Sequence, residues 1–200
     1  MALYLTGGEF RGHKLESVPG LSTRPTSASV RNAIFNILGD KVVGATAIDF
    51  FCGGGTLGIE TISHGAASCH FVENGFKARQ ILHDNIEKLQ IEEKCFLLSV
   101  NVFSCFESLQ KRGDKFDILF ADPPYKKPLA LPLIRKIEDS AILNSGAILV
   151  LETSSRELIK FPSSITVLKS RVAGDTAVHF ISFDKPNSDN YFSLSGSNDE

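Results

Sequence analysis

From about residue 40 onward, short apolar runs alternate with stretches in which apolar positions recur every three or four residues. Such alternation predicts strands and helices in turn, and therefore a parallel sheet covered by helices on both faces. The predicted helices are Phe76–Gln90 and Pro128–Asp139. The predicted strands are Ala45–Phe50, Ser68–Glu73, Cys95–Val100, Asp117–Ala121 and Gly146–Glu152.

The last two apolar runs, Ile165–Val172 and Ala177–Phe183, are separated by only four residues. That connection is too short for a crossover helix, so the two runs are expected to form an antiparallel hairpin. The predicted fold class is therefore α/β. It is a Rossmann-like fold with a seven-stranded, mostly parallel sheet and an antiparallel C-terminal hairpin.

The first forty residues have a different pattern. Leu3–Thr6 alternates like a strand, Lys14–Val18 can return beside it, and Ser27–Leu38 is a predicted helix with Thr26 or Ser27 as its N-cap. The final stretch is rich in Ser, Asn and Asp and is predicted to be disordered. We divide the chain into an N-terminal hairpin and helix (1–40), a core domain (41–184) and a tail (185–200).

Composition narrows the class of protein. The chain has 200 residues, of which 42% are hydrophobic and 22% charged, as expected for one substantial core with small extensions. It shows neither a secretory leader nor an apolar run long enough to span a membrane, so a cytoplasmic protein without a membrane partner is expected. Its four cysteines match no zinc spacing; reduced thiols and no metal are expected.

Charge is unevenly distributed. The net charge is −2, but four acidic residues and one lysine follow residue 183, which leaves +1 on the rest of the chain. Within the first 36 residues, basic side chains outnumber acidic ones, and they include Arg11, Arg24 and Arg31. A locally basic edge suits a phosphate backbone, although ordinary charge scatter on a solvated surface explains the pattern equally well.

A glycine-rich turn follows the first predicted core strand. Gly53, Gly55 and Gly58 form a G-x-G-x-x-G pattern that leads into a helix, and taken alone it suits a dinucleotide. The next strand ends in Glu73, about twenty residues further on, where a carboxylate can accept both ribose hydroxyl protons. These features fit either a dinucleotide or S-adenosylmethionine.

The tetrapeptide Asp122-Pro123-Pro124-Tyr125 follows another buried strand. Two prolines delete two N–H groups, so the loop mainly accepts hydrogen bonds. If Asp122 and the Pro123 carbonyl each accept one N–H of a planar amine while Tyr125 stacks on its ring, the nitrogen lone pair turns toward an electrophile. Methyl transfer uses this arrangement and hydride transfer does not, which favours S-adenosylmethionine. The structural alternative is a proline-stiffened turn with a capping aspartate.

With these motifs, the chain resembles class I methyltransferases. Over residues 3–183 it is similar to the RsmD-like family of 16S ribosomal RNA guanine-N2 methyltransferases. The resemblance is carried by Gly7-Gly8, Arg11-Gly12, Leu15, Arg24-Pro25-Thr26, Val30-Arg31, Phe35, Asp49, Phe51, Gly53, Gly55, Leu57-Gly58, Glu60 and the tetrapeptide. It implies methylation of one guanine N2 in the small subunit or an assembly intermediate, by an enzyme that we expect to be a monomer.

The resemblance also implies roles for individual residues. The catalytic set is Asp122, Pro123 and Tyr125, and the RNA contacts are Arg11, Arg24 and Arg31. The cofactor-binding set is Asp49, Phe51, Gly53, Gly55, Gly58, Glu73, Asn101 and Asp122. The chain departs from the family pattern at Gly75, where aspartate is common, and at Gly54, where Ser or Ala is usual. Asn101 is predicted either to bind the adenine amine or to close an Asx turn.

Other functions remain open from sequence. Methylation of adenine N6 in DNA or RNA, or of a glutamine amide, uses related Pro-Pro-Tyr loops. A non-catalytic RNA-binding assembly factor is the alternative of another class, although the intact Asp122, Tyr125 and Glu73 disfavour it. A guanine N2 is buried by base pairing, so the target is expected in a loop or as a splayed base.

Overall fold

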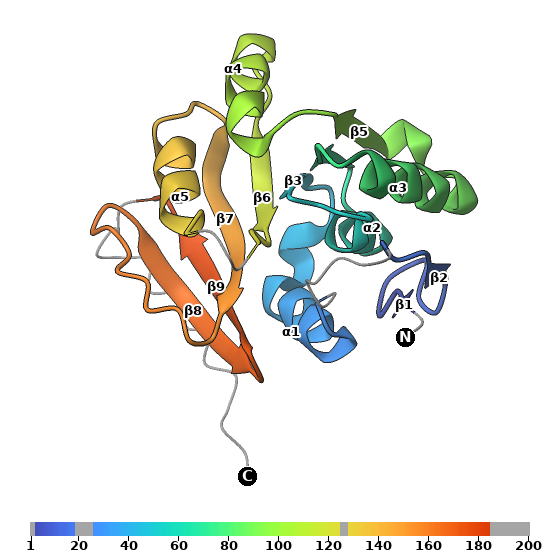
Figure 1. The fold of residues 1–200 in the computed structure, drawn as a ribbon, viewed down its shortest axis with the longest axis horizontal. Coiled ribbons are helices and arrows are strands. Elements are labelled where there is room, and N and C mark those ends of the chain that lie inside the picture. The colour runs from blue at the N-terminus through green and yellow to red at the C-terminus, as the bar shows by residue number, and fades with distance from the viewer. Residues whose placement is uncertain (1–2, 19–25, 125–127, 185–200) are drawn as a thin grey trace.

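The computed structural model describes residues 3–18, 26–124 and 128–184, and its centre is a seven-stranded sheet with the order β5-β4-β3-β6-β7-β9-β8 (Figure 1). The five strands from β5 to β7 run parallel, β9 pairs antiparallel with β7, and β8 pairs antiparallel with β9. The strands are β3 Thr46–Phe50, β4 Ser68–Val72, β5 Cys95–Leu98, β6 Phe116–Ala121, β7 Leu143–Ser154, β8 Thr166–Ala173 and β9 Thr176–Ser182. The predicted fold class is confirmed.

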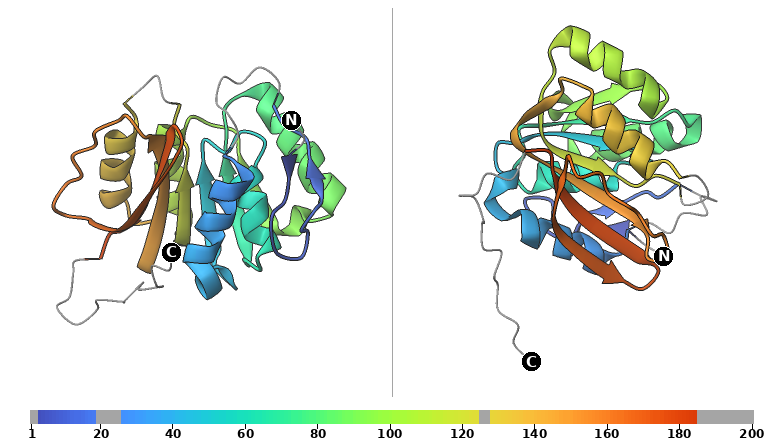
Figure 2. Two further views of the ribbon diagram at one scale, coloured as in Figure 1. Left: turned by 90° about the horizontal axis from the view of Figure 1, so that it is seen from below. Right: turned by 90° about the vertical axis from the view of Figure 1, so that its left-hand side faces the viewer.

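Helices cover both faces of this sheet, as the two side views in Figure 2 show. Helices α1 (Ala28–Leu38), α2 (Thr56–Ser63) and α3 (Phe76–Leu89) share one apolar core with the strands. Helices α4 (Val102–Arg112) and α5 (Ala130–Glu138) enclose a second core on the opposite face. Central strands buried on both faces explain the continuous apolar runs in the sequence. Two 3-10 turns, η1 (Gly39–Val42) and η2 (Glu92–Lys94), complete the layers.

The N-terminal segment packs onto the α1–α2–α3 face. Strands β1 (Leu3–Tyr4) and β2 (Lys14–Leu15) pair antiparallel beside α2 and α3 in Figure 1, and Leu5 and Leu15 belong to the same apolar core as the sheet. Gly8, with φ of +73°, lies so close to α2 that a Cβ atom would be 1.9 Å from the Ser63 carbonyl oxygen. The Gly-Gly pair therefore permits a close backbone contact.

One helix was missed from the sequence, and the structure decides between the two N-caps predicted for α1. Helix α4 was not predicted, although Asn101 caps it, its buried residues have helical spacing and Gly113 ends it in a left-handed conformation. At α1, Ser27 is the N-cap through its contact with the Val30 N–H, and Thr26 has another role. Interpreting the segment after Asn101 as a strand-closing turn hid a full helix.

The described residues test only some of the remaining predictions. The predicted tail (185–200) lies outside the described residues, and the division at residue 40 stays a prediction. All four cysteines are free, with Cys69 and Cys105 buried. Among the described helices, none combines the length and the apolar character needed to cross a membrane.

Candidate active site

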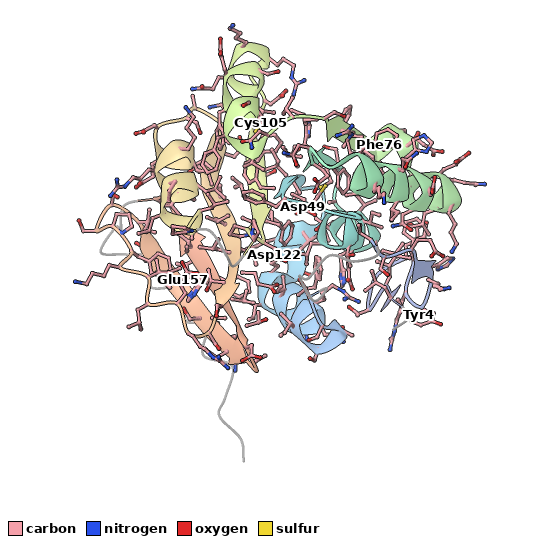
Figure 3. The ribbon with its side chains drawn as sticks, viewed as in Figure 1. Tyr4, Asp49, Phe76, Cys105, Asp122 and Glu157 are labelled. Atoms are coloured by element: carbon pink, nitrogen blue, oxygen red, sulfur yellow. The ribbon has the colours of Figure 1, made fainter. Side chains whose placement is uncertain are left out.

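The candidate site lies where the strand order reverses. The chain leaves β3 toward β4, whereas β6 pairs with the other side of β3, so the loops after β3 and β6 diverge. Ligands of open α/β sheets bind in the crevice at such a point. Asp49, at the end of β3, and Asp122, directly after β6, both lie in the centre of the molecule (Figure 3).

A cavity of about 410 Å³ occupies this crevice. The N-terminal segment forms one wall, and the loops that follow β3, β4 and β6 form the others. The lining residues are Leu3, Glu16, Ser17, Val18, Thr26, Asp49, Phe51, Cys52, Gly53, Gly54, Thr56, Leu57, Glu73, Asn74, Asp122 and Pro124. The glycine-rich turn, Glu73 and the loop that begins at Asp122 therefore surround a single cavity.

Glycine is needed at the three loop positions for different physical reasons. Gly53 has φ of +55° and open space where a side chain would begin, so its backbone can approach a ligand. A Cβ atom on Gly55 would lie 2.2 Å from Leu82 in α3, and one on Gly58 would lie 2.3 Å from Phe71 in β4. Gly55 and Gly58 therefore allow the loop and α2 to pack closely on their neighbours.

Asp49 holds the start of α2. Its buried carboxylate accepts a hydrogen bond of 3.0 Å from the Gly58 N–H. Burial raises the pKa of Asp49 to about 7, the Gly58 N–H opposes this, and the charge of Glu73 adds to it. A positively charged ligand in the cavity would lower the pKa of Asp49 and so favour its ionised form.

Glu73, one residue beyond β4, connects two loops. Its carboxylate accepts hydrogen bonds from the Gly53 N–H at 3.0 Å and from the Gly75 N–H at 2.6 Å. Each oxygen keeps a further lone pair for a ligand hydroxyl. A Cβ atom at Gly75 would lie 3.0 Å from Glu73 Oε1, so glycine at this position leaves room for that carboxylate.

Asp122 has the most unusual surroundings of the described carboxyls. Its Oδ1 atom is shielded from solvent and has no hydrogen-bond partner among the described residues. Burial raises the pKa of Asp122 well above its usual range, and the charges of Glu152 and Asp49 add to the effect. A shielded acceptor without a donor is costly in a protein and is satisfied when a ligand supplies an N–H.

The charge of the cavity wall indicates which ligand it can take. Four acidic residues, Glu16, Asp49, Glu73 and Asp122, are among the residues that line the cavity, and the described lining residues include neither lysine nor arginine. Repulsion would oppose a pyrophosphate in this space, whereas a cationic ligand would be attracted. The cavity therefore argues against the dinucleotide alternative.

Four further predicted residues remain to be placed: Phe51, Asn101, Pro123 and Tyr125. Phe51 lines the cavity with a left-handed backbone, φ of +60°. Asn101 is exposed and absent from the lining; its Oδ1 accepts the Phe103 N–H at 2.9 Å, so it caps α4. Pro123 is buried, and Tyr125 lies outside the described residues. Contacts of Phe51, Asn101 and Tyr125 with a cofactor or substrate stay predictions.

The prediction for Arg31 as an RNA contact is wrong. Its side chain is 1% exposed, and its Nε donates to Glu60 at 2.6 Å. Its other nitrogens donate to the backbone carbonyls of Thr26 and Tyr4, each at 2.6 Å. A guanidinium enclosed in this way cannot reach a phosphate. The available signal was Glu60, an acid within a buried helix that required a cationic partner.

The other predicted RNA contacts differ from Arg31. Arg11 is exposed in the connection between β1 and β2, whereas Arg24 lies outside the described residues. The structure therefore leaves Arg11 accessible, and contact with RNA stays a prediction for both residues.

Two polar residues connect the N-terminal segment to the site. Asn85 is fully buried, exchanges hydrogen bonds with the Glu16 N–H and carbonyl, and donates to the Gly54 carbonyl at 3.0 Å. The Thr26 hydroxyl donates to Glu152 at 2.8 Å. Sequence reasoning missed Glu152; an acidic residue within the apolar run of β7 was the only sign of its role.

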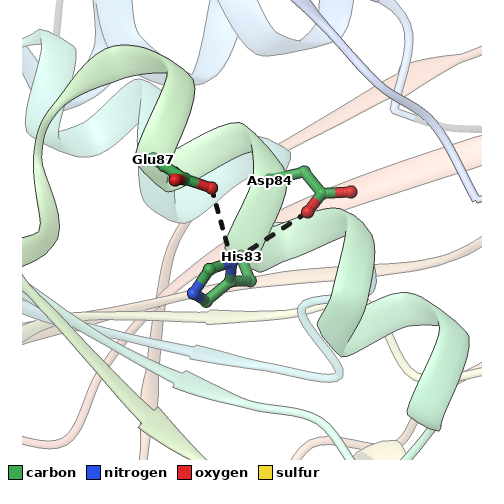
Figure 4. A group of neighbouring side chains, drawn as sticks. All are labelled: His83, Asp84 and Glu87. Carbon is green, nitrogen blue, oxygen red and sulfur yellow. Dashed lines mark ion pairs between the residues drawn. The ribbon is translucent and has the colours of Figure 1, made fainter.

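A second polar cluster lies on the outer face of α3 (Figure 4). His83 lies 3.9 Å from both Asp84 and Glu87, and all three side chains are exposed. None of them lines the cavity. His83 and Glu87 have the i,i+4 spacing of ordinary surface pairs on a helix, and the absence of a metal stays a prediction.

Comparisons with known proteins agree with this geometry. The family model described as conserved hypothetical protein 95 matches residues 3–182. The chain is 31% identical to "Putative rRNA methyltransferase YlbH" of Bacillus subtilis, over 86% of this chain and 94% of that protein. It is 30% identical to "Ribosomal RNA small subunit methyltransferase D" of Escherichia coli K12, over 86% of each. The solved structure of "Putative methyltransferase yhhF" from Escherichia coli has a TM-score of 0.77 and 30% identity, covering 90% of this chain and 97% of that one.

Proposed function

Because the chain belongs to the conserved hypothetical protein 95 family, the RsmD family of methyltransferases, we propose that it transfers a methyl group from S-adenosylmethionine to a guanine N2 in 16S ribosomal RNA. The observation that carries this proposal is the shielded, unpartnered Asp122 oxygen at the edge of an anionic cavity. It requires an N–H donor, and an exocyclic amine provides one.

The residues of the cavity fit S-adenosylmethionine, which supplies an electrophilic methyl group when bound. Its sulfonium and ammonium charges complement the acidic residues of the lining. Glu73 is proposed to accept the ribose hydroxyls, and the open face of Gly53 admits close backbone approach. Asp49 keeps α2 and the glycine loop in register, and Asn101 is proposed for the adenine amine.

The catalytic loop orients the acceptor. Asp122 accepts one N–H of the guanine amine and the Pro123 carbonyl accepts the other, which turns the nitrogen lone pair out of conjugation with the ring. Tyr125 is proposed to stack on the base. Catalysis then consists of orientation and of acceptors that strengthen as positive charge grows on nitrogen.

Ribosomal RNA as the substrate is supported by two relatives whose names are rRNA methyltransferases. Arg11, exposed at the edge of the N-terminal segment, and Arg24 are the proposed phosphate contacts. A monomer acting in the cytoplasm on the small subunit, or on an assembly intermediate, completes the proposal.

The test is transfer of labelled methyl from S-adenosylmethionine to small subunits that lack the modification, followed by nucleoside analysis. We expect the label in N2-methylguanosine. Label in N6-methyladenosine or in protein would refute the guanine assignment. RNA binding without any transfer would favour the assembly-factor alternative, and Asp122→Ala provides the inactive control.

A further inference from the structure

Glu152 is a buried acid next to the catalytic loop. It lies in β7, whose neighbour in the sheet is β6, and the last paired residues of the two strands are Ala121 and Leu151. Asp122 directly follows β6, and Glu152 is the next residue of β7. In a parallel pair, aligned residues project toward the same face, so both carboxyls lie on the face that α1 covers.

Glu152 is held in this position from the N-terminal segment. Its side chain is 3% exposed, and its Oε2 atom accepts a hydrogen bond of 2.8 Å from the Thr26 hydroxyl. Thr26 also lines the cavity, and its carbonyl accepts from the buried Arg31 guanidinium at 2.6 Å. The acid is therefore held by a residue that is itself held by the buried Arg31.

The reaction leaves a proton to be removed. The new N–C bond uses the nitrogen lone pair, and the electron pair of the broken S–C bond stays on sulfur. The acceptor nitrogen then carries one proton too many and a positive charge. The Asp122 carboxylate, proposed to bind this amine, is available as a base because its Oδ1 has no donor among the described residues.

We propose that Glu152 is a positioning residue of this site: held by Thr26, it acts through Asp122 so that the proton leaving the methylated amine passes to Asp122. Glu152 does not contact the substrate. The inference rests on the proposed methyl transfer.

The electrostatics support this role. The charge of Glu152 raises the pKa of Asp122, second only to burial, and Asp49 adds a smaller contribution from β3. Glu16 and Glu73 face the same cavity from its other walls, and Arg31 of α1 is directed to Glu60. A base with a raised pKa holds a transferred proton more firmly, which favours completion of the step.

The first experiment is a carbon-13 NMR titration of the Asp122 carboxyl in the protein without RNA, with Asp122→Asn to assign the signal. In Glu152→Gln the midpoint should move to lower pH, because a negative neighbour is removed. The exposed Glu157→Gln is the matched control and should leave it in place. An unchanged midpoint in Glu152→Gln would overturn the inference, whatever reaction the enzyme catalyses.

The second experiment is the pH profile of methyl transfer. In Glu152→Gln the acidic limb should move to lower pH, and kcat on the plateau should fall about tenfold, as for other buried partners that orient a reacting group, with the cofactor affinity unchanged. Thr26→Val should also lower kcat because it removes the hydroxyl that holds Glu152, whereas Thr26→Ser keeps the hydroxyl and should have the kcat of the wild type. A loss of kcat without movement of the limb would show a merely structural role and overturn the inference. A wrong acceptor nucleoside would refute the proposed function alone.

Discussion

The buried Arg31–Glu60 pair permits a quantitative test of what the N-terminal arginine does. Arg31→Met removes three hydrogen bonds, to Glu60 and to the carbonyls of Thr26 and Tyr4, and fills much of the same volume. It leaves Glu60 charged within the core, where its remaining donors are the N–H and hydroxyl of Thr6. Removing one partner of a buried pair costs about 3–5 kcal/mol.

That loss is a large part of the total stability, which for a domain of this kind is about 5–15 kcal/mol. Urea unfolding followed by circular dichroism should show a clearly lower midpoint for Arg31→Met and a similar loss for Glu60→Met. The double variant should lose less than the sum of the two, because it leaves no uncompensated charge. Arg11→Met, on the exposed connection between β1 and β2, is the control and should change stability by less than about 0.5 kcal/mol.

The opposite result is equally specific. If Arg31 contacted RNA phosphate, Arg31→Met would leave the urea midpoint in place, and the salt dependence of RNA binding would weaken by the equivalent of about one phosphate contact. That pair of results would refute the structural role derived from the buried ion pair.

Three further predictions test other parts of the site. Asp122→Ala should lower kcat by about 100-fold or more and leave S-adenosylmethionine affinity mostly intact, because a partner of the transition state is lost. Asp139→Ala at the end of α5 is the control, and unchanged turnover in Asp122→Ala would contradict the assigned role. Gly58→Ala should destabilise the fold by about 1–3 kcal/mol through overpacking against Phe71, whereas Gly54→Ala, whose Cβ would meet its nearest atoms at 3.4 Å, should melt like the wild type; equal melting temperatures would disprove the packing argument. Because the folded-state pKa of Asp49 is raised to about 7 from 3.8, the native state binds more protons between these values, and the free energy of unfolding without ligand should fall as pH rises through that window. In chemical denaturation, Asp49→Asn should reduce this dependence of stability on pH, and an unaltered dependence would exclude Asp49 as its source.

The strands and the location of the site could be predicted because both depend on local patterns. Apolar runs mark buried parallel strands, and the residues that follow them meet at one edge of the sheet. Gly53, Glu73 and Asp122 therefore lie around one cavity although they are far apart in the chain. The short final turn predicted the antiparallel pairing of β8 with β9, whereas the order of the strands in the sheet was not predicted.

The interpretation of polar residues could not be completed in the same way. A sequence does not show whether an arginine is paired in the core, so Arg31 resembled the exposed Arg11. Glu152 lacked a recognisable motif because its partner, Thr26, is 126 residues away. Such long-range pairs depend on how α1 packs across the sheet. Helix α4 could have been predicted, because its buried positions recur at helical spacing in the sequence.

Asn85 touches two segments with different proposed ligands. Its oxygen and nitrogen hold Glu16 in the N-terminal segment, and the same nitrogen holds the carbonyl of Gly54 in the glycine loop. A ligand that orders either segment also restrains this shared side chain and so reduces the entropy that the other ligand must still remove. Cofactor and RNA should therefore bind with positive cooperativity, and thermodynamic linkage makes the gain in affinity the same in both directions.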